Sequence, residues 1–298
     1  MIKEFPRIEL CLYRYLIEWI RYIIVIMAKK NKLLINGFSL RNPNAINGLQ
    51  KYPFSIPVIK YFKKIIFKKP ITFIIGENGS GKSTLIEAFA KYCGFNEEGG
   101  SRNIKFSTRN TTSDFCKYLH AEVSTEFRRF DGYFLRSETL YNLASEIETR
   151  CELTLLKPEF WGDYLPPEGT SAYGYNYEDV PSDYGDISLH KQSHGESVLS
   201  LLTNRISKRG VYLFDEPETG LSIHSLFMML NIINNLIKID AQFIICTHSP
   251  ILLAIPNADI YEIKDGALNL VQYEDTSYYN LTKYFMLNYK EMLKKLGI

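Results

Sequence analysis

The feature that most constrains this chain is the stretch from residue 71 to residue 84, which reads Ile-Thr-Phe-Ile-Ile-Gly-Glu-Asn-Gly-Ser-Gly-Lys-Ser-Thr. Ile71–Ile75 is β-prone and almost wholly apolar, which predicts a strand buried on both faces, as parallel strands are. Gly76–Ser83 then matches the phosphate-loop pattern G-x-x-x-x-G-K-[ST], and the apolar positions in Leu85–Ala90 predict a helix. This strand–loop–helix context separates a working phosphate loop from an accidental glycine-rich turn.

The residue types of the loop suit a polyphosphate. Such a ligand needs many donors at close range, and backbone N–H groups together with the positive end of the following helix supply them. The loop glycines permit backbone angles and approaches that a Cβ would block. We expect Lys82 to reach the β- and γ-phosphates and the Ser83 hydroxyl to bind Mg²⁺. The predicted nucleotide-binding residues are Gly76, Glu77, Asn78, Gly79, Ser80, Gly81, Lys82, Ser83 and Thr84.

A second apolar strand, Val211–Phe214, ends in two adjacent acids, Asp215 and Glu216. A buried strand should not end in paired acids without a reason such as a metal ion, although a strand ending in a solvated acidic turn is the alternative. Given the phosphate loop upstream, we expect Asp215 to hold Mg²⁺. Glu216 is expected to orient or deprotonate an attacking water.

A third apolar strand, Gln242–Cys246, is followed by Thr247-His248-Ser249-Pro250. A histidine at such a strand end can hydrogen-bond the γ-phosphate and report whether it is present, whereas a lone histidine elsewhere is more often structural. The candidate catalytic residues are therefore Glu216, His248 and Lys82.

Ser193-His194-Gly195-Glu196 precedes an apolar-faced helix and resembles the S-G-G-Q signature of ATP-binding-cassette ATPases. A helix N-terminus with Ser and Gly donors can face phosphate, but the simpler alternative is an N-cap at Ser193 with Glu196 three residues on. In the family, this loop acts in trans on the γ-phosphate that a second subunit holds. The resemblance therefore implies a homodimer with two ATP molecules between its subunits.

Four motifs follow one another over residues 76–249: the phosphate loop, the signature, the paired acids and the histidine. In this the chain resembles small stand-alone bacterial ATPases of AAA/ABC type. The strings that carry the likeness include Phe134-Leu-Arg-Ser-Glu, Ser193-His-Gly-Glu-Ser and Thr247-His-Ser-Pro-Ile-Leu-Leu-Ala. The resemblance implies an α/β fold, a P-loop NTPase with an ABC-type core: a largely parallel sheet, an N-terminal antiparallel β-layer and a small helical subdomain near residues 95–200. It also implies Mg²⁺-dependent hydrolysis of ATP.

Two details of the family pattern have only candidate positions in this chain. An aromatic residue upstream of the loop would stack on adenine, and Tyr52 and Phe54 are candidates, although both also suit a core. The usual Q-loop glutamine is not evident: Gln192 abuts the signature, and Arg136 or Glu138 would have to fill that place.

Residues 1–30 are predicted to be an N-terminal extension and residues 31–298 the ATPase domain. Ile8–Met27 is rich in Leu, Ile, Tyr and Trp, but charges recur too often for a bilayer span of about 20 apolar residues. The extension is either an amphipathic helix or an over-extended start with Met27 as the natural first residue. No integral membrane segment is expected.

Further elements follow from apolar periodicity and turn signals. We expect strands at 32–40, 64–67 and 131–136, short and long helices at 57–62, 138–150 and 222–239, a hairpin at 260–273, a C-terminal helix, and a long loop at 161–185.

The net charge of +2 gives no global argument for nucleic acid or an anionic membrane as partner. The five scattered cysteines, without a C-x-x-C pair, suit a reducing, cytoplasmic compartment. The sequence leaves three cellular roles open for the chain. These are an ATPase that drives an unknown protein or nucleic-acid partner such as a nuclease or toxin, the ATP-binding subunit of a membrane transporter, and a nucleotide-sensing module with little turnover.

Overall fold

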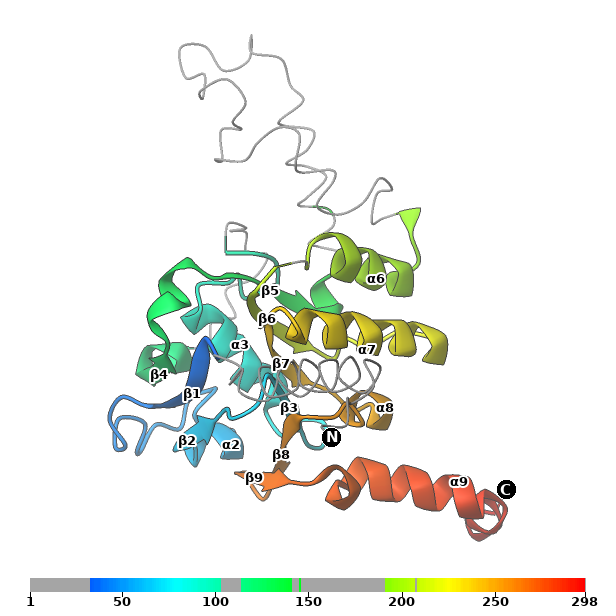
Figure 1. Ribbon diagram of the computed structural model, residues 1–298. Coiled ribbons are helices and arrows are strands. Elements are labelled where there is room, and N and C mark those ends of the chain that lie inside the picture. The colour runs from blue at the N-terminus through cyan, green and yellow to red at the C-terminus, as the bar shows by residue number, and fades with distance from the viewer. Residues whose placement is uncertain (1–32, 103–113, 141–144, 146–190, 207, 298) are drawn as a thin grey trace, which may run out of the picture. The chain divides into compact units, whose positions relative to one another are not determined.

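The computed structural model describes residues 33–102, 114–140, 145, 191–206 and 208–297. Its centre is a six-stranded sheet in the order β5-β6-β7-β3-β8-β9, in which every neighbouring pair is parallel except β8 and β9 (Figure 1). The strands are β3 (Ile71–Ile75), β5 (Asp131–Arg136), β6 (Gly210–Asp215), β7 (Gln242–Cys246), β8 (Ala258–Lys264) and β9 (Ala267–Val271). The predicted largely parallel α/β fold is confirmed.

A second, three-stranded antiparallel sheet has the order β2-β1-β4. It consists of β1 (Ile35–Leu40), β2 (Lys64–Ile66) and β4 (Leu119–Val123). This is the expected N-terminal antiparallel layer, with one strand, β4, that comes from much later in the chain and that the sequence analysis does not predict.

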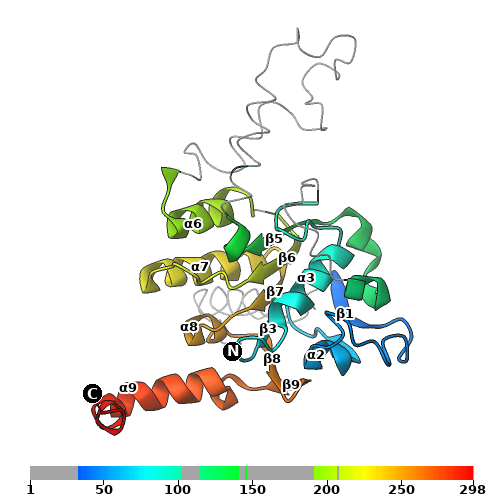
Figure 2. The ribbon, with the colours of Figure 1, turned by 180° about the vertical axis from the view of Figure 1, so that it is seen from behind.

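The helices lie on the two faces of the central sheet because the strand side chains are apolar on both. Ile71, Phe73 and Ile75 pack into a core with α6 (His194–Asn204) and α7 (Ile223–Ile237), whereas Ile74 belongs to a separate core. That second core contains α3 (Lys82–Tyr92), α2 (Pro57–Lys60) and the antiparallel sheet. Figure 2 shows the same layers from behind.

The predicted helices and strands between residues 32 and 92 and between residues 194 and 295 are confirmed, with shifts of a few residues at their ends. The remaining elements are α8 (Pro250–Leu253), α9 (Ser277–Lys295) and 3-10 turns at Asp114–Tyr118, Thr125–Arg129, Ser137–Thr139 and Tyr273–Asp275.

The helical subdomain near residues 95–200 stays a prediction. Within that range β4 and β5 join the two sheets, while residues 103–113 and 146–190 lie outside the described residues. The predicted loop at 161–185, the extension at 1–30 and most of the helix at 138–150 also lie outside them.

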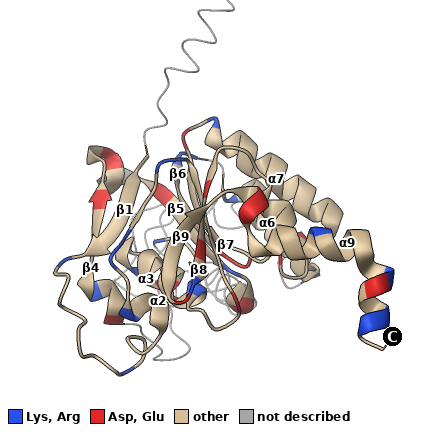
Figure 3. Cartoon of the chain, turned by 90° about the horizontal axis from the view of Figure 1, so that it is seen from below, with Lys and Arg blue, Asp and Glu red and all other residues tan. Residues whose placement is uncertain are grey.

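The C-terminal helix α9 differs from the others because none of its residues is buried. Leu281, Met286 and Leu287 are 66 %, 68 % and 73 % exposed, and the basic residues of its last turn, Lys294 and Lys295, lie toward the C-terminus (Figure 3). In the ranges that the structure describes, no helix combines the length and apolarity that crossing a bilayer would take.

One polar side chain ties the two sheets together. Gln242, at the start of β7, is 1 % exposed. Its Oε1 accepts hydrogen bonds from the backbone N–H groups of Leu34 and Ile35 at 3.1 and 3.0 Å, and its Nε2 donates to the Ile35 carbonyl at 2.7 Å. Because all these groups are buried, each needs its partner, and the amide sets the position of β1 relative to the central sheet.

Replacement of Gln242 by leucine keeps the side-chain volume but removes these three hydrogen bonds. We expect a loss of about 3 kcal/mol in the free energy of unfolding, because buried backbone groups lose their partners. Urea unfolding measures this loss, with Gln272→Leu, at an exposed position, as the matched control. Equal midpoints for the two variants would contradict the assigned role of the Gln242 amide.

Candidate active site

The loop between β3 and α3 has the glycine-dependent geometry that binding of a polyphosphate requires. Gly79 and Gly81 adopt φ values of 79° and 97°, in the left-handed region that other residues rarely enter. A Cβ at Gly81 would also lie 2.7 Å from side-chain atoms of Ile56 and Val58. The loop therefore folds tightly over the N-terminus of α3, where backbone N–H groups face outward.

Lys82 has a position from which it can reach a ligand. Its Nζ donates to the carbonyls of Gly76 at 2.8 Å and Glu77 at 3.1 Å, and the residue is 4 % exposed. Burial lowers the pKa of this ammonium group, while the nearby groups Cys246 and Glu216 oppose the shift. Its hydrogen-bond partners are neutral, so a phosphate would be a stronger partner for the same ammonium group.

The Ser80 hydroxyl, in the same loop, is buried with no hydrogen-bond partner among the described residues. A buried hydroxyl without a partner is costly, and one in a loop of outward-facing amides is suited to a ligand oxygen. This orphaned donor is an observation, independent of the sequence pattern, that fits a phosphate at the loop.

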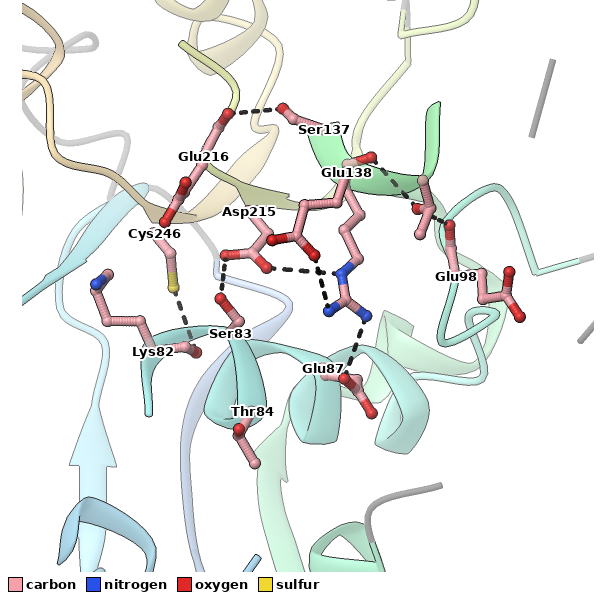
Figure 4. Close-up of polar contacts among 12 residues, drawn as sticks. Lys82, Ser83, Thr84, Glu87, Glu98, Ser137, Glu138, Asp215, Glu216 and Cys246 are labelled. Atoms are coloured by element: carbon pink, nitrogen blue, oxygen red, sulfur yellow. Dashed lines mark hydrogen bonds and ion pairs between the residues drawn. The ribbon is translucent and has the colours of Figure 1, made fainter. Parts of the chain in front are cut away.

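The first metal-ligand pair predicted from the sequence comes together in space. The Ser83 hydroxyl donates to Asp215 Oδ1 at 3.2 Å across 132 positions of chain, and Figure 4 shows the two side chains pointing toward each other. Asp215 ends the fully buried strand β6, and burial raises the pKa of its carboxyl to about 6, against the opposing effect of Arg136.

This pair fits Mg²⁺ on chemical grounds. Mg²⁺ prefers hard oxygen ligands and is usually held by one or two protein oxygens together with substrate phosphates. A hydroxyl and a carboxylate at the N-terminal end of α3 are such a set, and a cation there would relieve the buried negative charge of Asp215. Ser83 and Asp215 are the residues that would hold the ion.

Arg136 connects the end of β5 to this pair. Its guanidinium lies 3.3 Å from Glu87 Oε2 and 3.9 Å from Asp215 Oδ2. Burial raises the pKa of Glu87 to about 7, although Arg136 opposes that shift. Arg136 and Glu138 are the two positions that could replace a Q-loop glutamine. Arg136 contacts Asp215 directly, whereas the Glu138 side chain is 79 % exposed and reaches the site only through Arg136, at 3.6 Å.

Glu216 is held in an unusual backbone conformation. Its φ is +50°, which costs on the order of 1 kcal/mol or more for a residue of this kind. Two hydrogen bonds stabilise it: its N–H donates to the Cys246 carbonyl at 2.9 Å, and its own carbonyl accepts from Ser137 Oγ at 2.6 Å. With this backbone conformation the Glu216 carboxylate lies beside His248, at the end of the next strand.

His248 lies beside Glu216, as a switch histidine would. Its Nε2 is 3.2 Å from Glu216 Oε1, and its Nδ1 is 2.6 Å from the hydroxyl of Tyr278. Its backbone N–H and the Thr247 hydroxyl both donate to Glu218 Oε1, at 2.6 and 2.7 Å.

Sequence reasoning missed Glu218 and Tyr278. For Glu218 a signal exists, since a third acid follows the acidic pair at an interval of two residues. No local pattern marks Tyr278, which reaches the site from α9.

The four signature residues lie at the start of α6 and form a complete capping box. Ser193 Oγ accepts from the Glu196 N–H at 3.3 Å, and Glu196 Oε2 accepts from the Ser193 N–H at 2.9 Å. The local structure is thus the N-cap foreseen as the simpler alternative. Ser193, His194 and Glu196 are exposed, and Gly195 packs near Gly220 after the acidic pair.

The two candidates for adenine stacking separate clearly. Phe54 is 7 % exposed and packs edge-on against Phe115 and Tyr118, so it belongs to the core. Tyr52 is 57 % exposed, and its hydroxyl lies 3.5 Å from Thr84 Oγ1 at the start of α3. Tyr52 is therefore the remaining candidate.

A cavity of about 620 Å³ borders the phosphate loop. Gly76, Glu77 and Gly79 line it from the loop, and Lys264 and Gly266 line it from the β8–β9 turn. The loop is therefore flanked by open space and is accessible to a ligand.

The raised pKa of Glu87 predicts a pH dependence of stability. A carboxyl whose folded pKa is about 7 and whose ordinary value is 4.5 destabilises the folded chain progressively as pH rises between these values. We expect Glu87→Gln to remove this effect. The difference in free energy of unfolding between Glu87→Gln and wild type should then be more favourable to the variant at pH 8 than at pH 4, by on the order of 3 kcal/mol. Urea unfolding at both pH values tests this. Glu122→Gln, exposed on β4, is the control, and parallel pH profiles of wild type and Glu87→Gln would contradict it.

Comparison with known proteins shows which family the chain matches. An AAA domain family model matches residues 46–249. An ABC transporter ATP-binding protein of Sulfurisphaera tokodaii is 26% identical over 222 residues, which are 71% of this chain and 41% of that protein. The ribose import ATP-binding protein RbsA of Bacillus cereus is 22% identical over 200 residues, 64% of this chain and 37% of that protein. The chain thus spans about two fifths of the length of these relatives.

Among solved structures, an inward-facing metal-chelate type ABC transporter has a TM-score of 0.42 at 16% identity, covering 76% of this chain and 82% of that one. CbiO1 of Clostridium perfringens has a TM-score of 0.38 at 15% identity, covering 80% and 91%. The family model spans more than half of the chain and contains the phosphate loop, the acidic pair and His248. The chain therefore belongs to this AAA domain family.

Proposed function

We propose that the chain binds ATP with Mg²⁺ and hydrolyses it to ADP and phosphate. The observation that carries this proposal is the 3.2 Å contact between Ser83 and Asp215, which joins the phosphate-loop helix to the strand that ends in Glu216. The orphaned Ser80 hydroxyl and the buried Lys82 support it, because both would gain partners from a triphosphate.

In the proposed reaction, loop N–H groups and the Ser80 hydroxyl hold the phosphates. Lys82 Nζ exchanges the carbonyls of Gly76 and Glu77 for β- and γ-phosphate oxygens. Ser83 and Asp215 would hold Mg²⁺, which would neutralise part of the charge that develops on those oxygens.

Glu216 orients the attacking water, which approaches in line with the bond that breaks. His248 lies 3.2 Å from Glu216, and in the proposed reaction its Nε2 hydrogen-bonds an oxygen of the γ-phosphate. The Glu216–His248 and Ser83–Asp215 contacts exist without a ligand, and such preorganisation favours the transition state.

We further propose that two copies enclose two ATP molecules, each held by the phosphate loop of one copy and the Ser193–Glu196 segment of the other. The exposure of that segment supports this arrangement. Glu196 requires a rearrangement, since its carboxylate occupies the donors at the start of α6 that a phosphate would use.

We propose that the chain is cytoplasmic and that its ATP hydrolysis drives the action of a partner protein or nucleic acid. The described cysteines, Cys93, Cys116 and Cys246, are free, which suits a reducing compartment. The ATP-binding subunit of a transporter is the second candidate, and the names of the curated relatives favour it. Co-purification of the native chain with an integral membrane protein, or with a soluble protein or nucleic acid, separates the two.

Lys82→Ala tests the site. We expect loss of ATP binding by at least tenfold and loss of phosphate release, because no other described cation lies on the loop. Lys60→Ala, exposed on α2, is the control. Normal turnover in Lys82→Ala would refute the site, and tight ATP binding without phosphate release in the wild type would instead indicate the nucleotide-sensing module.

Glu216→Gln tests the dimer. We expect this variant to bind ATP and Mg²⁺ but to hydrolyse it at least a hundredfold more slowly, so that the ATP-bound dimer accumulates. Size-exclusion chromatography with light scattering should give a dimer with ATP and a monomer with ADP. Glu216→Gln combined with Lys82→Ala should stay monomeric, and a monomer in all conditions would contradict the shared-ATP arrangement.

A further inference from the structure

The first turn of α9 places one side chain inside the site. The Tyr278 hydroxyl donates to the Gly76 carbonyl at 2.7 Å and lies 2.6 Å from His248 Nδ1. The two rings meet edge-on at 85°, with their centroids 5.3 Å apart. A single phenol thus contacts both the first glycine of the phosphate loop and the histidine at the end of β7.

The proton count of these contacts determines the state of the histidine. A tyrosine hydroxyl carries one proton, and a carbonyl can only accept, so the contact with Gly76 uses that proton. The Tyr278 oxygen can then only accept from His248, and Nδ1 must carry a proton. Nε2 faces the Glu216 carboxylate at 3.2 Å, and a carboxylate can also only accept, so both ring nitrogens carry a proton when all these contacts are made. The phenol and the carboxylate together fix the orientation of the ring.

The start of α9 is anchored firmly enough to hold Tyr278 in place. Thr276 caps the helix: it is fully buried, its hydroxyl donates to the Tyr273 carbonyl at 2.7 Å, and it accepts from the Tyr279 N–H at 3.3 Å. Burial also raises the pKa of Tyr278 to about 12, so its hydroxyl remains protonated and available as a donor.

We propose that Tyr278 is a positioning residue for ATP hydrolysis, which acts by holding His248 with Nε2 toward Glu216 and the γ-phosphate. It also keeps a hydrogen bond on the Gly76 carbonyl after Lys82 Nζ leaves that carbonyl for the nucleotide. The inference rests on the proposed ATPase function and adds to it a residue outside the phosphate loop, the acidic pair and the histidine strand.

Tyr278→Phe removes the hydroxyl and keeps the ring that packs on His248. The matched control is Tyr273→Phe, because the Tyr273 hydroxyl also donates to a backbone carbonyl, that of Pro250 at 3.0 Å, without contacting His248. We expect kcat of Tyr278→Phe to fall roughly tenfold, as for the loss of the hydrogen bond that positions His248, with KM for ATP within about twofold of wild type. Tyr273→Phe should match wild type in both constants.

A double-mutant cycle with His248→Ala shows whether the effect passes through the histidine. Adding Tyr278→Phe to His248→Ala should change kcat by less than about twofold, since the group being positioned is already gone. Equal kcat values for Tyr278→Phe and Tyr273→Phe, or additive losses in the cycle, would overturn the inference. An inactive wild type would instead show the failure of the proposed function.

A spectroscopic readout tests the same inference without turnover. Ring nitrogen chemical shifts of histidine report which nitrogen is protonated, and His248→Ala identifies the signal among the five histidines. We expect Nδ1 of His248 to be protonated in the wild type and in Tyr273→Phe, and its chemical shift to change in Tyr278→Phe, where its hydrogen-bond acceptor is gone. An unchanged Nδ1 shift in Tyr278→Phe would contradict the role of the hydroxyl.

Discussion

A carboxylate buried at the end of a hydrophobic strand is the constraint on which the site depends. Asp215 is 4 % exposed and follows a strand of wholly buried residues, so its negative charge needs nearby partners. The Ser83 hydroxyl and, at longer range, Arg136 supply them within the protein. Because Glu87 shares the same arginine, Arg136 compensates the charge of Asp215 only in part, and a bound cation would add positive charge beside that carboxylate.

The sequence predicts those parts of the molecule whose patterns are local. The strands at 71–75, 211–214 and 242–246 are apolar on both faces, and the phosphate loop, the acidic pair and His248 follow directly from the ends of such strands. Parallel strands bring their carboxyl ends to one edge of the sheet, which is why motifs more than a hundred residues apart meet there.

What the sequence did not predict depends on contacts between distant segments. β4 pairs with β1 across about eighty residues, and five alternating residues are too short a pattern to identify such a strand. The Gln242 amide, whose partners lie in the first strand, reads locally as one polar residue at a strand start. Tyr52 and Phe54 are also indistinguishable in sequence, because exposure is a property of the folded chain.

The candidate site includes a residue that lies beyond the end of the family match. The match ends at residue 249, yet the phenol that touches His248 belongs to a helix that starts at Ser277. Most of that helix extends away from the core with its apolar side chains uncovered. A force on the turns of α9 that precede the kink at Asn288 would therefore displace the phenol that contacts His248, whereas the kink would absorb part of a force on the last turns.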